Sequence, residues 1–297
     1  MLHQSLPLFC EIDDFCRCFV PLWQQRLLAD KPRHRHRQPV MHLSEVMTLL
    51  VLFQMSGFRN LKTFYLGYVA RERRRDFPNL VSYQRFVELQ RDAVLPLTAY
   101  LYTRRGNCTG LSFVDSTKLQ VCHNRRINQH EVFKDYATRG KSSTGWFYGF
   151  KLHLVINDVG ELLAFHLTVA NVDDRTPVPI MTQDLWGKLV ADRGYISQEL
   201  FNKLFEQGLQ LVTRLRKNMK NKFMPVCDKI LLRKRAIIES VNDQLKNIAQ
   251  IEHTRHRSFW NFLGTVVAGL IAYTWQEKKP SLKLRRDDAQ QLPAMVF

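Results

Sequence analysis

Alternating apolar and polar positions mark the middle of this chain, whereas its first hundred residues follow helical spacing. Period-2 patterns predict strands over residues 111–122, 147–157 and 161–170. Residues 157–160 have the composition of a tight turn, which would join the last two strands. We therefore expect three consecutive strands that pair as an antiparallel meander.

Beyond the meander, the pattern alternates between helices and strands. It predicts a helix from about residue 176, a buried strand ending at Asp192, a helix over 197–208, a strand over 209–215 and a helix around Glu239. Three strands followed by such an alternation give the element order of a ribonuclease-H-like fold. We predict an α/β domain whose mixed sheet is flanked by helices.

Charge is the first compositional feature that changes this picture. The chain carries 44 Lys and Arg against 27 Asp and Glu, a formal charge of +17, and its pI is about 9.8. Such a surplus favours polyanions, with binding that depends steeply on salt and little on sequence. A merely soluble basic protein and a binder of anionic membrane surfaces are the alternatives, and nucleic acid is the favoured partner.

Neither secretion nor membrane insertion is indicated. The first residues lack the charged start and apolar stretch of a signal peptide, and the longest apolar run, 262–275, is too short to span a bilayer. We interpret that run as a buried helix. The six cysteines have no paired spacing and are expected to be free thiols in a cytoplasmic protein with no membrane contact.

The helical first part has the character of a small DNA-binding bundle. Ser44 and Ser82 are placed to cap two helices, and another helical pattern runs from residue 60 toward 75. Basic runs at 31–37 and 71–75 flank these helices. We predict an all-α, helix-turn-helix-like DNA-binding domain over residues 1–105, a catalytic domain over 106–280 and a C-terminal tail over 281–297.

Three carboxylates in apolar surroundings are the candidate chemistry. Asp115 shares a strand face with apolar residues, Asp192 follows a short buried strand, and Glu239 lies on a helix between two cations, Arg235 and Lys246. Such carboxylates repel one another unless a divalent cation neutralises them, and oxygen ligands select Mg²⁺ or Mn²⁺. A two-metal site acting on phosphodiesters follows.

These residues resemble the DDE transposases of bacterial insertion sequences over about residues 110–275. There are 76 residues between the two aspartates and 46 between Asp192 and Glu239. Around the glutamate, the chain is similar to the family signature Y-x2-R-x3-E-x6-K through Arg235, Glu239 and Lys246, with Leu232 in place of the tyrosine. The insertion sequence 982 family is the subgroup that the chain resembles most.

The resemblance implies a protein that binds the terminal inverted repeats of its element, cleaves their 3′ ends and joins them to target DNA, as a dimer or larger assembly on double-stranded DNA. Two Mg²⁺ ions, replaceable by Mn²⁺, would be held by the three carboxylates, which would be both catalytic residues and metal ligands. The expected DNA contacts are Arg235, Lys246, Arg193, Arg73 and Arg74.

Other interpretations stay open at this level. Singly, each carboxylate is explained as a capping, buried or surface residue, and Asp173, Asp174 and Asp184 are rival metal ligands. Trp146 and Tyr148 either stack on a flipped or frayed base or belong to the core. A nuclease that does not join ends, and a DNA-binding protein without catalysis, are the other functional classes.

Overall fold

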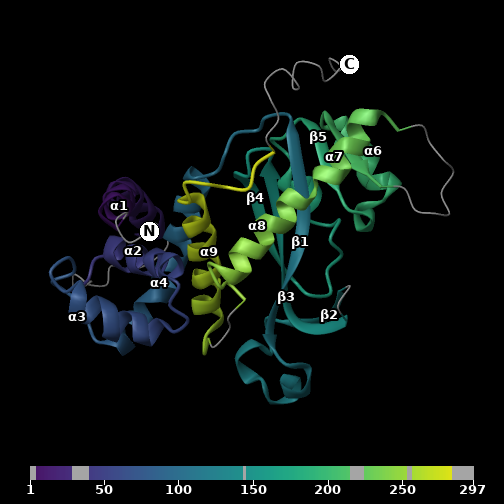
Figure 1. Ribbon diagram of the computed structural model, residues 1–297. Helices are drawn as coiled ribbons and strands as arrows, with labels where there is room; N and C mark the ends of the chain where they lie inside the picture. Colours follow the sequence, from purple (N-terminus) through teal and green to yellow (C-terminus); the bar gives the residue numbers. More distant parts are fainter. Residues whose placement is uncertain (1–4, 29–39, 143–144, 215–223, 253–255, 283–297) are drawn as a thin grey trace. The chain divides into compact units, whose positions relative to one another are not determined.

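The computed structural model describes residues 5–28, 40–142, 145–214, 224–252 and 256–282 (Figure 1). The chain forms two compact units, one of residues 1–104 with 244–275 and the other of residues 105–243 with 276–297. The first contains helices only and the second contains the sheet. The assignment of DNA binding and catalysis to residues 1–105 and 106–280 stays a prediction.

The helical unit is built around one strongly apolar helix. Its elements are α1 (Ser5–Leu28), α2 (Leu43–Ser56), the π-helical turn η2 (Thr63–Val69), the short α3 (Ala70–Glu72), α4 (Tyr83–Thr103) and α9 (Phe259–Thr274). Helix α9 packs against α4 and α2, and almost all its side chains from Phe262 onward are buried. The prediction that residues 262–275 form a buried helix is confirmed. No helix in the described part of the chain is both long and apolar enough to cross a membrane.

Capping explains where two of these helices begin. The Ser82 hydroxyl accepts a hydrogen bond from the Arg85 N–H at 3.3 Å, as the sequence predicts for α4. The expected cap at Ser44 is wrong, because α2 begins after His42, whose N–H donates to the Glu45 carboxylate at 2.7 Å. Ser44 lies inside the helix, and its hydroxyl donates to Asp13 of α1 at 2.7 Å.

The sheet contains the expected meander. Its strands are β1 (Leu111–Cys122), β2 (Thr138–Ser142), β3 (Gly145–Asn157), β4 (Leu162–Val169), β5 (Gly187–Ala191) and β6 (Leu209–Thr213). Strand β3 pairs antiparallel with β1 on one side and with β2 and β4 on the other, whereas β5 pairs parallel with both β1 and β6. The mixed order β4-β3-β1-β5-β6 is that of the predicted ribonuclease-H-like fold, which is confirmed.

Helices cover the two faces of this sheet. They are α5 (Val178–Met181), α6 (Gln198–Glu206), α7 (Val226–Lys234) and α8 (Ala236–Asn247), with short 3₁₀ turns η3 (Asn124–Gln129), η4 (Glu131–Phe133) and η5 (Arg193–Tyr195). Side chains of α5 and α6 pack with Val114, Val155 and Leu189 in one core on the first face. Helix α8 lies along β1 on the other (Figure 1). Because the opposite faces of β1 carry alternate residues, Asp115 points toward α8.

One close approach fixes the pairing of β1 with β3. The register between these strands shifts at residues 120–122, opposite Gly149. Gly149 has a φ of +155°, and a Cβ atom there would lie 2.1 Å from the carbonyl oxygen of Leu119. Only glycine fits at this position, since any side chain would collide with backbone that cannot move without breaking the ladder.

Candidate functional site

Asp115 is held on the central strand by apolar neighbours. It lies on the same face of β1 as Phe113 and Leu119, both fully buried, and its own side chain is 21% exposed. Burial raises the pKa of Asp115 to about 6, and the nearby Arg235 guanidinium opposes that rise. The negative charges of Glu239 and Asp192 raise the pKa further, so both carboxylates lie close enough to act on this site.

Asp192 comes next to Asp115 through the parallel pairing of two strands. The register of β1 and β5 aligns Phe113 with Val190, and the same register continued by two residues aligns Asp115 with Asp192. Asp192 is exposed and ends β5, where η5 turns the chain away. The Tyr195 ring at the end of that turn is buried in the core beside Leu189, and burial raises the pKa of its phenol well above the usual value.

Glu239 reaches the site from the first turn of α8. Its carboxylate is paired with the guanidinium of Arg235, four residues earlier, and the same guanidinium lies 3.7 Å from Asp115 Oδ1. Arg235 therefore links the first and third candidate carboxylates. The buried residues Ile237, Ile238, Val241 and Leu245 fix this face of α8, whereas Ile248, just beyond the helix end, is exposed.

A fourth residue touches the first carboxylate. Asn242 lies one helical turn after Glu239, is 8% exposed, and donates its amide N–H to Asp115 Oδ2 at 3.1 Å. In the sequence, Asn242 stands three residues after Glu239, a spacing that puts both side chains on one face of a helix. Its spacing was the only available signal, because a hydrogen bond across 127 residues cannot be read from local pattern.

The oxygen donors fit a hard divalent cation, although they are not gathered around one. Within the described ranges, no three His, Cys, Asp or Glu side chains lie close enough together to hold a metal ion. The charge that partly neutralises Asp115 and Glu239 is instead Arg235. The carboxylates of Asp115, Asp192 and Glu239 nevertheless repel one another, and burial removes Asp115 from most of its water. Carboxylate oxygens are the ligands that Mg²⁺ and Mn²⁺ prefer.

The expected DNA contacts within the sheet unit differ in their surroundings. Arg193 is exposed immediately after Asp192, at the end of β5. The Arg235 side chain is only 18% exposed and is committed to two carboxylates. Leu232, at the position where the family signature has tyrosine, is buried, and its carbonyl oxygen accepts from Arg214 at 3.5 Å.

The expected contacts in the helical unit are also of two kinds. Arg73 pairs with Asp76 at 2.8 Å and donates to the Ser5 hydroxyl at 2.5 Å, so it stabilises the bundle, whereas Arg74 is exposed. Lys246 pairs with Glu252 at 3.2 Å beside Arg59, in an open hollow of about 290 Å³. The basic run at 31–37 lies outside the described residues.

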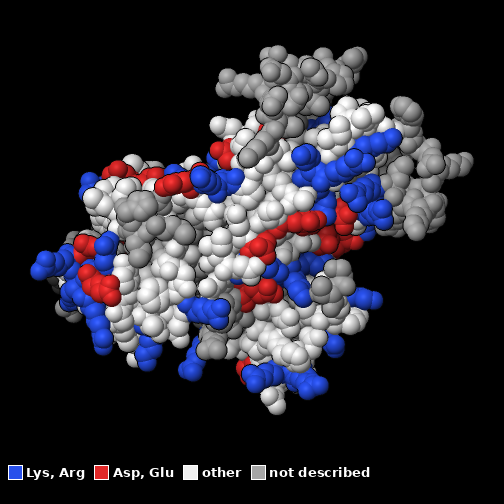
Figure 2. Space-filling model, viewed as in Figure 1, with Lys and Arg blue, Asp and Glu red and all other residues white. Residues whose placement is uncertain are grey.

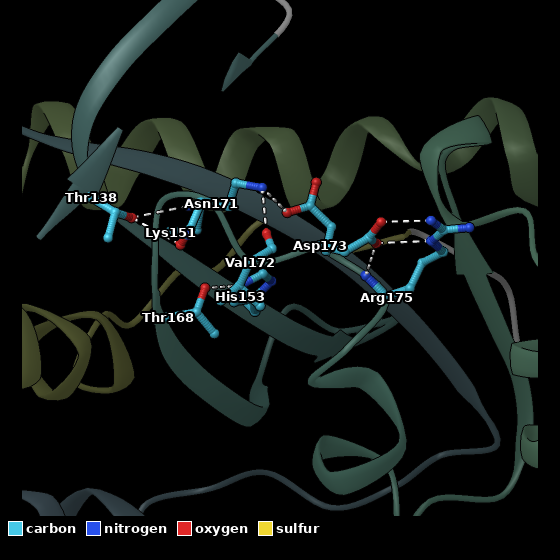
Figure 3. Close-up of polar contacts among 9 residues, drawn as sticks. Thr138, Lys151, His153, Thr168, Asn171, Val172, Asp173 and Arg175 are labelled. Atoms are coloured by element: carbon cyan, nitrogen blue, oxygen red, sulfur yellow. Dashed lines mark hydrogen bonds and ion pairs between the residues drawn. The ribbon is translucent and has the colours of Figure 1, made fainter. Parts of the chain in front are cut away.

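Two of the three rival aspartates, Asp173 and Asp174, have structural partners. Asp173 accepts from the backbone N–H and the guanidinium of Arg175, which holds the pKa of its carboxyl at about 2 (Figure 3). Asp174 pairs with Lys151 at 2.9 Å, and Lys151 also donates to the Val172 carbonyl oxygen. These contacts order the loop after β4 and explain both residues without a metal ion.

His153 belongs to the same polar group. It lies on β3 opposite Ser116 of β1, is 1% exposed, and its Nε2 lies 2.8 Å from the Thr168 hydroxyl (Figure 3). Burial lowers the pKa of His153 to about 4, so the ring is neutral near pH 7. On the register of β1 and β3, it points to the face opposite Asp115.

Of the two strand aromatics Trp146 and Tyr148, one faces solvent and the other belongs to the core. Tyr148 is buried, and its hydroxyl donates to the Phe133 carbonyl oxygen at 3.0 Å, so it belongs to the core. Trp146, two residues earlier on β3, is 57% exposed. The six cysteines are unpaired, as expected.

Two comparisons with known proteins found similarity to this chain. Residues 105–259, which include all three candidate carboxylates, match the family model described as "Transposase DDE domain". One similar solved structure is described as a Mos1 transposase paired-end complex with left transposon end, at 12% identity and a TM-score of 0.21. That alignment covers 64% of this chain and 65% of the other chain, just under two thirds of each. No curated protein sequence matches the chain.

Proposed function

Because the chain belongs to the transposase DDE domain family, we propose that it cleaves the ends of a DNA element and joins their 3′-hydroxyls to target DNA. The observation that carries this proposal is the convergence of Asp115, Glu239 and Arg235, with Asp192 aligned on the neighbouring strand. The three carboxylates come from three separate elements, with Asp115 inside β1, Asp192 directly after β5 and Glu239 in the first turn of α8.

The proposed metal ligands are the carboxylates of Asp115, Asp192 and Glu239. Two bound Mg²⁺ or Mn²⁺ ions would supply activation of the attacking water or 3′-hydroxyl and stabilisation of the leaving oxygen. Asn242 orients the Asp115 carboxylate through its amide, and the apolar face of β1 keeps that carboxylate from rotating toward solvent. Arg235 limits the repulsion between Asp115 and Glu239 before the site is loaded.

The proposed DNA contacts are basic side chains in both units. Arg193 is the exposed cation next to the site, and Arg235 can exchange a carboxylate partner for a phosphate oxygen because both accept two guanidinium hydrogen bonds. Lys246 and Arg74 would contact the DNA backbone, whereas the pairing of Arg73 with Asp76 makes it the weakest of these candidates. Residues 1–105 would supply recognition of the terminal inverted repeats.

The remaining parts of the proposal follow from this chemistry. Two element ends have to be processed together, so the acting form would be a dimer or larger on double-stranded DNA. The subgroup would be that of insertion sequence 982, and the place of action the bacterial nucleoid. Each of these rests on the resemblance of the sequence to its family and on the charge of +17.

The test is an assay of a labelled duplex that ends in the element's terminal repeat. Wild type and Asp115→Asn are compared in Mg²⁺, in Mn²⁺ and in EDTA, and the products are separated into nicked and joined strands. Metal-dependent joining that the variant lacks is expected. Nicking without joining would identify a nuclease instead, and binding without any product from wild type would contradict the proposed catalysis.

A further inference from the structure

The indole of Trp146 is one of the large apolar side chains that the sheet unit exposes outside the candidate site. It is 57% exposed, although tryptophan is normally covered in a single protein molecule. It lies near the start of β3, where that strand pairs with β2, opposite Lys141. A large apolar ring presented to solvent at the end of a two-stranded ribbon indicates a contact with another molecule.

Neighbouring groups hold this ring in place. The Arg139 guanidinium lies 5.7 Å from the ring centroid, within the range of a cation–π interaction. The amide of Asn124, in the 3₁₀ turn after β1, donates to the Trp146 carbonyl oxygen at 2.8 Å. Next along β3, Phe147 and Tyr148 are buried, which anchors the strand directly beside the exposed ring. The indole is therefore presented by a supported backbone.

Cations surround the ring. Residues 123–148 contain five Lys and Arg but two carboxylates, Glu131 and Asp135. Lys134 pairs with Glu131 at 3.6 Å, whereas Arg125, Arg126 and Lys141 are exposed and have no ion pair with a described residue. Figure 2 shows Lys and Arg atoms gathered over the end of the sheet unit where Figure 1 draws the segment between β1 and β2. We call Trp146 with Arg125, Arg126, Arg139 and Lys141 the tryptophan ribbon.

The chemistry of the tryptophan ribbon selects among possible occupants. An aromatic plane and several unpaired cations match a nucleic-acid strand, whose bases offer faces for stacking and whose phosphates offer negative charge. A paired, stacked duplex exposes phosphates but covers the faces of its bases. Full use of the indole therefore requires a nucleotide that is unpaired. A second copy of this chain would bring the same positive charge to the contact and is disfavoured.

We propose that the tryptophan ribbon binds an unpaired nucleotide of the DNA substrate, with its base on the Trp146 ring and its flanking phosphates on Arg125, Arg126 and Lys141. The proposal rests on DNA being the substrate of the candidate site. It adds a binding site that recognises frayed or single-stranded DNA rather than its sequence.

The test compares two duplexes of equal length, one fully paired and one with a few mismatched base pairs near its end. Binding of each by the full chain is measured by fluorescence anisotropy in EDTA, so that no chemistry intervenes. Wild type is expected to prefer the frayed duplex. Trp146→Ala should lose about tenfold in affinity for it and little for the paired duplex, because the unpaired base then has no aromatic ring to stack on.

Matched variants separate stacking from folding. Trp146→Phe keeps an aromatic plane and is expected to retain most of the preference. Trp260, on α9, is another exposed tryptophan with an arginine beside it, since the Arg91 guanidinium lies 5.8 Å from its ring centroid. Trp260→Ala is expected to leave the affinity for both duplexes unchanged. Arg126→Ala and Lys141→Ala should weaken both duplexes at low salt and leave the preference intact.

Three results would overturn the proposal. The first is equal wild-type affinity for the two duplexes, which leaves DNA as a substrate but removes the unpaired-nucleotide site. The second is an equal loss on both duplexes in Trp146→Ala, or a dimer that dissociates in that variant, which would make the ring a general or protein contact. The third is no DNA binding by wild type, which would remove the proposed function as well.

Discussion

At the scale of single residues, Asn242 is the most informative side chain that the fold brings to the candidate site. Its amide is the donor to Asp115 Oδ2, and its position on α8 is set by the buried Val241 and Leu245 on either side of the same turn. A carboxylate on a strand has rotational freedom about its last bond, and a fixed donor removes it. Asn242 is thus a positioning residue for Asp115.

Changing Asn242 should reduce the rate of cleavage rather than the affinity for DNA. We expect Asn242→Ala to lower kcat about 10- to 100-fold with little change in KM, since a hydrogen bond to a charged group contributes about 1.5–3 kcal/mol. Asn242→Ser, which keeps a short donor, should recover part of the rate. Asn202→Ala, on the exposed face of α6, is the control. A variant with raised KM and normal kcat would assign Asn242 to DNA binding.

His153 should make folding stability depend on pH. Its folded pKa of about 4 lies below the ordinary 6.5, so between these values the unfolded chain binds more protons than the folded one. The contribution of the neutral His153 ring to the free energy of unfolding is therefore complete above pH 6.5. It is lost as the pH falls toward 4, and the loss is on the order of 3 kcal/mol at most. Denaturant titrations at pH 7.5, 6 and 5 should show this slope in wild type and a shallower one in His153→Gln. Identical slopes would contradict the assignment.

At the scale of elements, the sheet positions the site. Parallel pairing of β1 with β5 brings Asp115 beside Asp192, and α8 lies along the face to which Asp115 points. The long strand β3 holds β1 from the other side, and the register of the two strands pairs Asp115 with Leu154. A slip by one residue would turn Asp115 to the wrong face.

Gly149 should be intolerant of substitution for this reason. Gly149→Ala places a Cβ atom against the Leu119 carbonyl oxygen, and we expect it to lower the free energy of unfolding by about 2–4 kcal/mol. Gly194→Ala is the control, because no heavy atom lies within 4 Å of its added Cβ and its φ is ordinary. Chemical denaturation of both variants decides the matter, and equal stability would show that the ladder adjusts.

Local pattern predicted the sheet unit better than the helical one. Strand β1 has apolar residues at positions 111, 113, 119 and 121 on one face, so it was predictable, whereas β2 reads Thr-Arg-Gly-Lys-Ser and has no apolar face to detect. Asp115 was predicted from its place on an apolar strand face and Asp192 from a strand end, but the ion pairs of Arg235 with both Asp115 and Glu239 depend on how α8 packs. The exposure of Trp146 beside the buried Tyr148 depends on the ribbon at which β3 begins, which the sequence did not predict.

At the scale of the whole molecule, the formal charge of +17 sets how the chain meets DNA. Each phosphate that a Lys or Arg neutralises releases condensed counterions, so affinity for duplex DNA should fall steeply with salt. This term acts on any sequence. Specific recognition of terminal repeats must come in addition to it, from contacts with base edges.

The salt dependence provides a test of Lys246. If it neutralises one phosphate, Lys246→Ala should reduce the slope of log K against log salt by about 0.9. Glu252→Gln removes the carboxylate partner of Lys246. This variant should bind duplex DNA more tightly, with a slope of log K against log salt equal to that of wild type or steeper. Anisotropy titrations from low to high salt give both slopes. An unchanged slope in Lys246→Ala would make the residue structural.

The most direct test of the central claim is cleavage by the three carboxylate variants at matched occupancy of DNA. The variants are saturated with the terminal-repeat duplex, and product formation in Mg²⁺ is measured for Asp115→Asn, Asp192→Asn and Glu239→Gln. The control is Asp184→Asn, which changes an exposed aspartate that is an alternative metal ligand by sequence. The account predicts full binding by all four and products from the Asp184 variant alone. Wild-type cleavage by any one of the three would contradict it.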